Sequence, residues 1–505
     1  MSLNVGEIGV FTELGALEKV LIHCPDQGVG HVVPSKAQEW LYEDIVHLPK
    51  MKQEYAQFKK LLLAYLDPEL LKVWIKKEHE GIAPGQLASP YSAHYLKSHK
   101  VIDAQDALVE VLNNYQVRTA IVASICAVED TGYHIQRFLM DENAVSTREL
   151  SRILITGIVE KGRIPLYPHS MVFAPVPNFL FTRDIGITVR NHIILSRSAS
   201  NARRRESILS RYIMYHVLLD KEYSRVLEMM DPENFFMMDT VAKERAKITL
   251  EGGDIMIISP EHLLIGVSER TTPYAAQAIV EEVFKEEVGI KKVSIVRLPK
   301  TRAMMHLDTV MTQVSRNAWV LFKQLVRSED PYIKKVVSDL GVVDPKNAQK
   351  AIVVQFKRLA SGFGTNRDIT CIKDLLLDIS CNDFGCKKEE VKFIYSGQGG
   401  VLYDEREQWT DSCNVVALRE GQVIGYDRNE RTAEGFREAG FEPIEVATVL
   451  DKISEKVLEN PEINITNLLE EIVPKQALLM INSAELSRAR GGPHCMTMPI
   501  KRAAL

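Results

Sequence analysis

The sequence predicts an α/β protein built on a repeated unit, to which blocks of helices have been added. Segments 251–299 and 413–446 share the order strand, turn, strand, helix, strand, which indicates a pseudo-symmetric fold. A second observation is that apolar residues recur at helical spacing between residues 51 and 160. With 505 residues, of which 46% are hydrophobic and 26% charged, the chain is long enough to bury a large core.

The chain opens on a predicted strand and continues into helices. LEKVLIHCP (17–25) is a short apolar run that stops at a proline, as a buried strand bounded by a turn does. Helical periodicity then predicts helices over 51–66, 103–115 and 147–162, the last ending at a glycine. We therefore expect a helical domain inserted over 51–160.

The two copies of the repeated unit carry clear boundary signals. EGGDIMIISPEHLLIGV (251–267) predicts two strands joined at a Ser-Pro-Glu turn. The helix that follows has Thr272 as its N-cap, Pro273 at its first position and Gly289 as its stop. Segment 413–446 repeats the succession around a Glu-Gly turn, although the two copies share little sequence identity.

Residues 325–385 do not follow this pattern and predict a further, mostly helical insertion. The α/β part that will carry the site is therefore expected to consist of 1–50 and 160–505, interrupted by 51–160. Within the insertion, helical spacing predicts helices over 331–341, 347–362 and 369–380.

Charge and targeting signals exclude several classes of partner. The 62 Lys and Arg residues are balanced by 67 Asp and Glu, a net charge of −5, so no global field attracts nucleic acid or an anionic membrane. The first residues lack the basic and apolar regions of a signal peptide, and no apolar run reaches the roughly 18 residues of a membrane span.

The seven cysteines are odd in number and scattered, which favours a reducing compartment such as the cytoplasm. Cys371, Cys381 and Cys386 lie close together in sequence. They lack a C-x-x-C pair and a nearby histidine, so three ordinary thiols are expected there rather than a zinc site.

Two of the four clusters of reactive residue types look ordinary in isolation. PVPNFLFTRDIG (175–186) is most simply a proline-rich turn with a surface ion pair. EGGDIMIIS (251–259) is most simply a tight turn with solvated acids, although its two glycines let backbone approach a carboxylate closely.

The third cluster is AMMHLDTVMTQV (303–314), which predicts a largely buried strand. In a strand, His306 and Asp308 point to one face and Leu307 to the other. A lone histidine here would be a satisfied core residue, but a buried carboxylate on the same face requires a partner. The segment is therefore a candidate for function.

The fourth cluster is ELSRARGGPHCMTMPIKR (485–502). The Gly-Gly-Pro run places Cys495 in a loop, with Arg488 and Arg490 just upstream. A thiol beside cationic groups has a lowered pKa and becomes a nucleophile, so we expect a reactive rather than an inert cysteine.

Together the clusters supply the groups needed to hydrolyse a cationic guanidinium. Cys495 is the nucleophile, His306 the proton carrier, and Glu251 the acid that orients it. Asp184 and Asp308 are further carboxylates that hold the guanidinium and compensate its charge. A peptidase has no use for two carboxylates around its scissile carbon, and the surroundings of papain-like cysteines are missing.

The chain resembles bacterial arginine deiminases, within the guanidino-group-modifying superfamily. The resemblance covers most of the chain apart from 325–385, and its motifs are, in order, FTRD, EGGD, SERT, MHLDTV, REQW, YDRN and RGGPHCM. It implies a five-bladed, pseudo-symmetric α/β propeller with an inserted helical domain. It also implies that Cys495 forms a covalent amidino intermediate without metal or organic cofactor, in a cytoplasmic homo-oligomer that acts on free L-arginine.

The resemblance extends to substrate-binding positions. Asn178, Arg203 and Arg270 match residues that bind the substrate carboxylate, Phe181 one that packs on its alkyl chain, and Arg490 an arginine of a mobile loop. Two departures stand out. Ala489 replaces a glycine that is common in the family, which matters if the loop needs a positive φ. The insertion at 325–385 has no counterpart in typical members.

Two alternatives stay open. The covalent chemistry also suits amidino transfer to an amine, or deimination of agmatine, methylarginine or protein-bound arginine. The carboxylate-binding set argues for a free amino acid, since agmatine has no carboxylate. A catalytically silent member of the family would be expected to lack its nucleophile or its histidine, and both are present.

Overall fold

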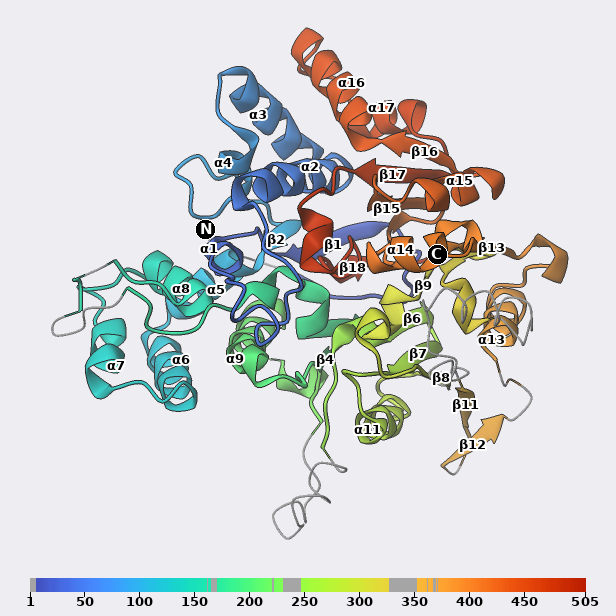
Figure 1. Cartoon of the computed structure of the whole chain (residues 1–505), viewed down its shortest axis with the longest axis horizontal. Coiled ribbons are helices and arrows are strands. Elements are labelled where there is room, and N and C mark those ends of the chain that lie inside the picture. The colour runs from blue at the N-terminus through green and yellow to red at the C-terminus, as the bar shows by residue number, and fades with distance from the viewer. Residues whose placement is uncertain are drawn as a thin grey trace.

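The computed structural model describes residues 6–160, 162–164, 170–219, 222–229, 247–326, 352–360, 362–366, 369 and 371–505. Figure 1 shows helices around the outside of a set of small sheets. The helices of the first half are α1 Gln27–Gly30, α2 Leu48–Leu66, α3 Pro68–His79, α4 Pro84–Ala88, α5 Ala104–Leu112, α6 Tyr115–Val128, α7 Tyr133–Met140, α8 Thr147–Thr156 and α9 Arg204–Ile213. Those of the second half are α11 Pro273–Val283, α13 Ile372–Asp378, α14 Tyr403–Trp409, α15 Glu430–Glu438, α16 Val446–Glu459 and α17 Ile465–Ile472.

The described strands form five separate sheets. Two of them are β3 Gly186–Val189, β4 His192–Leu195 and β5 Val226–Leu227, and β9 Met311–Ser315, β10 Ala318–Leu321 and β13 Lys392–Tyr395. The largest contains β6 Ile255–Ser259, β7 His262–Val267, β8 Lys292–Arg297, β11 Ile352–Arg358 and β12 Phe363–Asn366. The fourth contains β14 Val416–Arg419, β15 Gln422–Tyr426, β16 Glu442–Glu445 and β17 Ala477–Ile481. The fifth joins both ends of the chain: β1 Leu17–Ile22, β2 Val101–Asp103 and β18 Met498–Arg502.

The predicted first strand and the predicted helices over 51–66, 103–115 and 147–162 are confirmed as β1, α2, α5 and α8. Helix α8 ends earlier than predicted, because Gly157 adopts a left-handed φ of 75° and caps it there.

The helices between residues 48 and 156 pack in two groups. Helices α2 and α3 share one apolar core with α16 and α17 from the C-terminal part of the chain. Helices α5 to α8 belong to a second core, together with α9. Figure 1 shows α2, α3 and α4 on one side of β2, with α6, α7 and α8 on the other. Strand β2 lies between the two groups in the chain and pairs in parallel with β1.

The repeated unit is present in both predicted places, with one difference between the copies. In the first, β6 and β7 form a hairpin, α11 crosses over, and β8 returns parallel to β7. In the second, β14 and β15 form the hairpin and α15 crosses over, but β17 lies between β15 and β16. Helix α11 begins at its predicted cap and ends before Gly289, which has a φ of 77° in the turn that follows.

The predicted helix over 347–362 is wrong, because Ile352–Arg358 forms strand β11. Strand β11 pairs antiparallel with β8 and extends the largest sheet. The reason lies in its period: Val353 is buried, Val354 exposed and Gln355 buried, which suits one face of a sheet. The predicted helix over 369–380 is confirmed in part as α13, and the one over 331–341 lies outside the described residues.

Candidate active site

Polar side chains stand just before the first hairpin strand of four sheets and before the last strand of the fifth. They are Asp184 before β3, Glu251 before β6, Asp308 before β9, Asn414 before β14 and Cys495 before β18. Three of the turns that carry them are short 3-10 helices in contact with one another, in the order η2 Thr182–Ile185, η7 Gly252–Asp254 and η9 Leu307–Thr309. Residues far apart in sequence therefore meet at one centre.

The predicted strand over 303–314 is corrected by the structure, because β9 starts only at Met311. His306 has extended φ and ψ angles of −136° and 162°, and η9 follows directly. The Thr309 hydroxyl donates to the carbonyl of His306 at 2.7 Å, which closes the turn. His306 and Asp308 are both buried, so it is the turn, rather than strand alternation, that brings them to one site.

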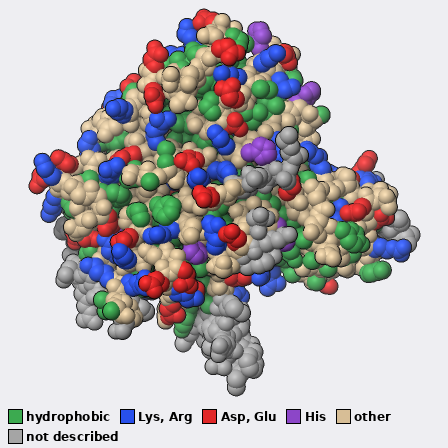
Figure 2. All heavy atoms as spheres, turned by 180° about the vertical axis from the view of Figure 1, so that it is seen from behind, with side chains coloured by type: hydrophobic (Ala, Val, Ile, Leu, Met, Phe, Trp, Pro, Cys, Tyr) green, Lys and Arg blue, Asp and Glu red, His purple; other side chains and the backbone are tan. Residues whose placement is uncertain are grey.

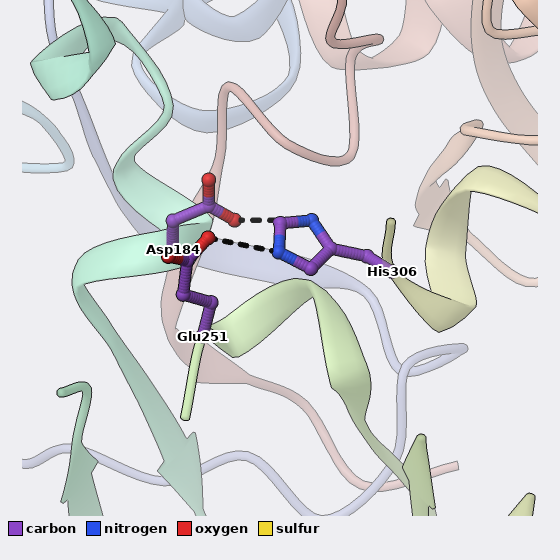
Figure 3. Close-up of side chains that lie close together, drawn as sticks. All are labelled: Asp184, Glu251 and His306. Atoms are coloured by element: carbon purple, nitrogen blue, oxygen red, sulfur yellow. Dashed lines mark hydrogen bonds and ion pairs between the residues drawn. The ribbon is translucent and has the colours of Figure 1, made fainter. Parts of the chain in front are cut away.

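The ring of His306 faces the carboxylates of Asp184 and Glu251, as Figure 3 shows. Its Nε2 is 3.0 Å from Glu251 Oε2, and its Nδ1 is 3.8 Å from Asp184 Oδ1. Burial opposes the charged imidazolium, but Asp184, Glu251 and Asp254 raise the pKa of His306 to about 9. Burial likewise opposes ionisation of Glu251, yet Arg203 and His306 hold its pKa below the usual range. The histidine is therefore cationic at neutral pH.

The two glycines of the EGGD motif permit this close packing, as predicted. A Cβ on Gly253 would lie 2.7 Å from His306 Nδ1 and 2.9 Å from Asp308 Oδ1. A Cβ on Gly252 would lie 2.0 Å from the carbonyl oxygen of Arg183. Side chains at either position would displace the groups that surround the histidine.

Arg203 reaches into the same centre from the start of α9. Its Nη1 donates to Asp184 Oδ2 at 2.9 Å and to Glu251 Oε2 at 3.1 Å. Its Nε donates to Glu206 Oε2 at 2.8 Å. Burial raises the pKa of Glu206 to about 7 although Arg203 opposes this change. The guanidinium of Arg203 thus links the two catalytic candidates and compensates part of their charge.

Cys495 lies in a turn at the end of the glycine-rich loop and is 2% exposed. Its backbone N–H donates to Asn414 Oδ1 at 3.0 Å, and the Nδ2 of Asn414 donates to its Sγ at 3.1 Å. The Sγ also lies 3.5 Å from Asp308 Oδ2. The thiol is therefore held by one amide and faces one carboxylate.

The predicted lowering of the thiol pKa by the loop arginines is wrong. Arg488 donates to Asp44 at 2.7 Å, and the guanidinium of Arg490 lies 3.6 Å from the centre of the Trp409 ring. Burial, followed by the charges of Asp308 and Asp184, raises the pKa of Cys495 well above its ordinary value. These surroundings therefore favour the neutral thiol over the thiolate.

A chain of buried polar groups supports Asp308. His494 Nδ1 is 2.8 Å from Asp308 Oδ2, and His494 Nε2 is 3.5 Å from Glu13 Oε2. Arg183 binds both carboxylate oxygens of Glu13, at 3.0 and 3.2 Å. Burial opposes ionisation of Asp308, but the hydrogen bond from His494 lowers its pKa below the usual value.

A cavity of about 310 Å³, including its open mouth, lies beside the thiol. Four of the five catalytic candidates line it; the fifth, Asp308, contacts the lining residue Cys495, with its Oδ2 3.5 Å from the Sγ. The other lining residues are Leu41, Arg302, Met305 and all five predicted substrate-binding residues, namely Asn178, Phe181, Arg203, Arg270 and Arg490.

Several buried polar atoms around the cavity make no hydrogen bond to the described residues. Two are carboxylate oxygens near the thiol, Asp184 Oδ1 and Asp308 Oδ1. Others are arginine donors, Arg203 Nη2, Arg270 Nε and Arg490 Nη2. Buried polar groups normally have partners, so these atoms leave both acceptors and donors free to bind a polar ligand.

The loop departure at Ala489 does not strain the backbone. Ala489 ends the 3-10 helix Leu486–Ala489, and the left-handed φ of 62° belongs to Arg490. Arg490 Nη1 donates to the carbonyl of Trp409 at 2.8 Å, which fixes the loop against α14. Phe181 packs under the next residue, where a Cβ on Gly491 would lie 2.3 Å from its ring.

Sequence reasoning missed Asn414, Asp254, His494 and Glu13. Asp254 and His494 lie inside the EGGD and RGGPHC motifs, so their motifs were a usable signal. Asn414 precedes a strand in the second repeated unit, at the place where other strands carry site residues. Nothing in the sequence around Glu13 points to a role beside His494.

One group in the described residues has the geometry of a cation site, and it is the trio Asp184, Glu251 and His306. Arg203 Nη1 already donates to both carboxylates of this trio, so a side chain of the protein supplies a positive charge there. Cys371, Cys381 and Cys386 are free thiols outside this group.

Two surface features bear on partners. On the face shown in Figure 2, basic and acidic side chains are interspersed, in keeping with the balanced charge of the chain. No helix in the described part of the chain combines the length and apolarity needed to cross a membrane.

Comparison with known proteins identifies related chains over nearly the full length. The arginine deiminases of Listeria monocytogenes and Staphylococcus aureus are 26% and 25% identical over 509 residues, each covering 98% of both chains. Among solved structures, an amidinotransferase from Microseira wollei in the saxitoxin biosynthetic pathway aligns with 99% of this chain and 98% of its own at 11% identity. Its TM-score of 0.44 is too low to establish a common architecture.

The family assignment rests on a model of the whole family rather than on any single relative. The arginine deiminase family model matches residues 100–502, which span every catalytic candidate. The chain therefore belongs to the arginine deiminase family.

Proposed function

We propose that the protein hydrolyses free L-arginine to L-citrulline and ammonia through a covalent amidino intermediate on Cys495. The observation that carries this proposal is the set of buried polar atoms at the site that make no hydrogen bond within the described residues. Acceptor oxygens of Asp184 and Asp308 near the thiol suit the N–H groups of a guanidinium. Donors of Arg203 and Arg270 on the cavity wall suit the carboxylate of an amino acid.

Charge supports a cationic substrate. Burial and the carboxylates of Asp308 and Asp184 raise the pKa of Cys495. A guanidinium bound between them would neutralise their effect and add a positive charge beside the sulfur. Substrate binding would therefore favour the thiolate just when the carbon to be attacked is in place.

The proposed first step replaces a C–N bond by a C–S bond. The Sγ of Cys495 attacks the central guanidinium carbon, and the thiol proton passes to the departing nitrogen, which becomes ammonia. His306, cationic at neutral pH, gives its proton to the ammonia, which leaves as ammonium. Cys495 then carries a cationic amidino group, and His306 is neutral.

The second step reverses the bonding at sulfur. Neutral His306, oriented by Glu251, takes a proton from water while the water oxygen attacks the same carbon. The C–S bond breaks, the remaining proton of the water returns to sulfur, and citrulline is released. His306 ends protonated, as it began.

We infer that the five sheets are the blades of a pseudo-symmetric propeller around this centre, with the helices of 51–160 as an inserted domain. Support comes from the turns before the strands, each of which brings a polar residue to the same place. We also infer a cytoplasmic homo-oligomer, because the seven cysteines are free and the family resemblance implies assembly. Light scattering of the purified protein tests the oligomeric state.

The test of the function is a comparison of substrates. Purified protein is incubated with L-arginine, with agmatine, and with L-arginine plus glycine, and citrulline and ammonia are quantified. We expect equimolar citrulline and ammonia from arginine alone, and at most weak turnover of agmatine, which leaves the arginine donors unpaired. Product formation only with an amine acceptor would contradict hydrolysis and favour amidino transfer.

The Cys495→Ala variant is the matched control. It retains every carboxylate and arginine of the cavity, so it is expected to bind arginine without turnover. Isothermal calorimetry measures the binding, and residual citrulline formation above a few per cent of wild type would mean that the nucleophile is another group.

A further inference from the structure

Asn414 is completely buried, and its side chain hydrogen-bonds to the segments that carry Cys495 and Asp308. Its Oδ1 accepts the backbone N–H of Cys495 at 3.0 Å. Its Nδ2 donates to Cys495 Sγ at 3.1 Å and to the backbone carbonyl of Asp308 at 3.1 Å. One amide therefore fixes the backbone of the nucleophile, contacts its sulfur, and ties it to the turn that carries Asp308.

Asn414 also occupies a position that is used functionally elsewhere in the fold. It stands just before β14, as Asp184 stands before β3 and Asp308 before β9. In the sheet that contains β14, the residue before the first strand is Asn414, and its side chain contacts Cys495. This placement indicates a functional residue rather than one that only packs in the core.

The surrounding backbone is built to hold this amide against the sulfur. The Asn414 backbone N–H donates to the carbonyl of Asp411 at 3.0 Å, and the Thr312 hydroxyl donates to the carbonyl of Cys413 at 2.7 Å. A Cβ on Gly492 would lie 2.7 Å from Asn414 Oδ1 and 2.6 Å from its carbonyl oxygen. The glycine of the loop thus lets the nucleophile turn close over the asparagine.

The thiol needs a donor because its other neighbours are acidic. Burial disfavours a negative charge on the sulfur, and the charges of Asp308, Asp184 and Asp411 add to this effect. The hydrogen bond from Asn414 acts in the opposite direction. A donated N–H strengthens when its acceptor becomes charged, so the bond gains most when the thiolate forms.

We propose that Asn414 is a further catalytic residue, whose amide N–H stabilises the Cys495 thiolate and whose amide oxygen fixes the backbone of that cysteine. This inference rests on the proposed function for its place in the reaction. The N–H assists both steps: it stabilises the sulfur as it attacks, and again as it departs when the C–S bond breaks. In the covalent intermediate the sulfur is a weak acceptor, and the bond contributes least.

The closing experiment measures thiol reactivity without any substrate. The rate at which iodoacetamide alkylates Cys495 is followed between pH 6 and 11 by mass spectrometry of the peptide that contains it. Wild type is compared with Asn414→Ala, which removes the amide, and with Asn414→Asp, which keeps an acceptor for the Cys495 N–H but loses the donor. The matched control is Asn429→Ala, a buried asparagine that bonds to Thr410 instead.

Loss of a hydrogen bond to a charged group lowers the thiolate population about 10- to 100-fold at a given pH. We expect Asn414→Ala and Asn414→Asp to slow alkylation at pH 8 by about this factor and to move its midpoint to higher pH. Asn429→Ala should keep the wild-type midpoint. Should Asn414→Ala fail to fold, Asn414→Leu, which keeps the side-chain volume without adding a charge beside the sulfur, replaces it.

The inference is overturned if folded Asn414→Ala, or Asn414→Leu in its place, alkylates at the wild-type rate and midpoint, since the amide would then contribute nothing to the thiolate. Arginine turnover is measured on the same preparations. If wild type does not turn over arginine but the Asn414 variants still show the alkylation shift, the proposed function is wrong and the role of Asn414 is still supported.

Discussion

The carboxylate of Asp254 accepts the backbone N–H of Leu307 at 2.9 Å, and this bond holds the turn that carries both His306 and Asp308. The other oxygen of Asp254 accepts the hydroxyl of Ser268 at 2.6 Å. Within the described residues Asp254 makes no hydrogen bond to a side chain of the candidate site, although its charge raises the pKa of His306; its bond to Leu307 places two catalytic candidates. It is a positioning residue.

Removal of this anchor is expected to impair turnover more than binding. Asp254→Ala leaves the buried N–H of Leu307 unpaired, which costs about 2 kcal/mol of unfolding free energy. Displacement of His306 should lower kcat about 100-fold, with a smaller change in KM. Steady-state kinetics and urea unfolding measure both effects. Asp254→Asn keeps an acceptor, so its kcat should lie between those of wild type and Asp254→Ala. A wild-type kcat in Asp254→Ala would refute the positioning role.

A methyl group at Gly253 should disrupt the site without unfolding the protein. Its Cβ would press on His306 Nδ1 and Asp308 Oδ1, so we expect Gly253→Ala to lower kcat by about 100-fold. Gly85→Ala is the control, because the nearest atom to its Cβ is 3.8 Å away on Lys52. Citrulline assays and thermal unfolding are compared for both variants. Equal activity in the two would show that the site tolerates the added carbon.

The alkaline limb of the rate profile should report His306. Its pKa of about 9 is raised by acidic neighbours, so the proton that it donates is lost as pH rises through 9. Glu251→Gln removes one negative charge and should move this limb to lower pH by about one unit. Profiles of kcat/KM between pH 6 and 10 measure the shift. An unmoved limb in Glu251→Gln would assign the ionisation to another group.

Asp411 should destabilise the fold at neutral and alkaline pH. Burial and the nearby Asp308 raise its pKa from 3.8 to about 7, although Arg490 opposes this. Because the folded pKa exceeds the unfolded one, folding binds the proton more tightly, and stability is lost as pH rises from about 4 through 7.

Asp411→Asn removes this titration. Between pH 5 and pH 8, the unfolding free energy of the variant should rise relative to wild type by about 3 kcal/mol. Urea unfolding at the two pH values gives the difference, in which groups common to both proteins cancel. A constant difference at both pH values would show that Asp411 does not titrate in this range.

The sequence by itself determined the residue types of the site and the local elements. The 3.6-residue period of 51–66 was enough for α2, and the Thr272-Pro273 pair was enough to start α11, because these signals act within one element. The motifs were enough to predict that Cys495, His306 and Glu251 share one site, because a nucleophile, a proton carrier and an acid that orients it act together.

Tertiary structure decided what those residues experience. The loop arginines lie close to Cys495 in sequence, yet Arg488 pairs with Asp44 and Arg490 stacks on Trp409, so the thiol faces Asp308 instead. Pairing with β8 likewise made a strand of Ile352–Arg358, where helical spacing predicted a helix. The contact of Asn414 with Cys495 spans 81 positions of sequence, and no local pattern encodes it. Electrostatics and sheet pairing act through space, so only the folded chain fixes the pKa values and the partners of the site.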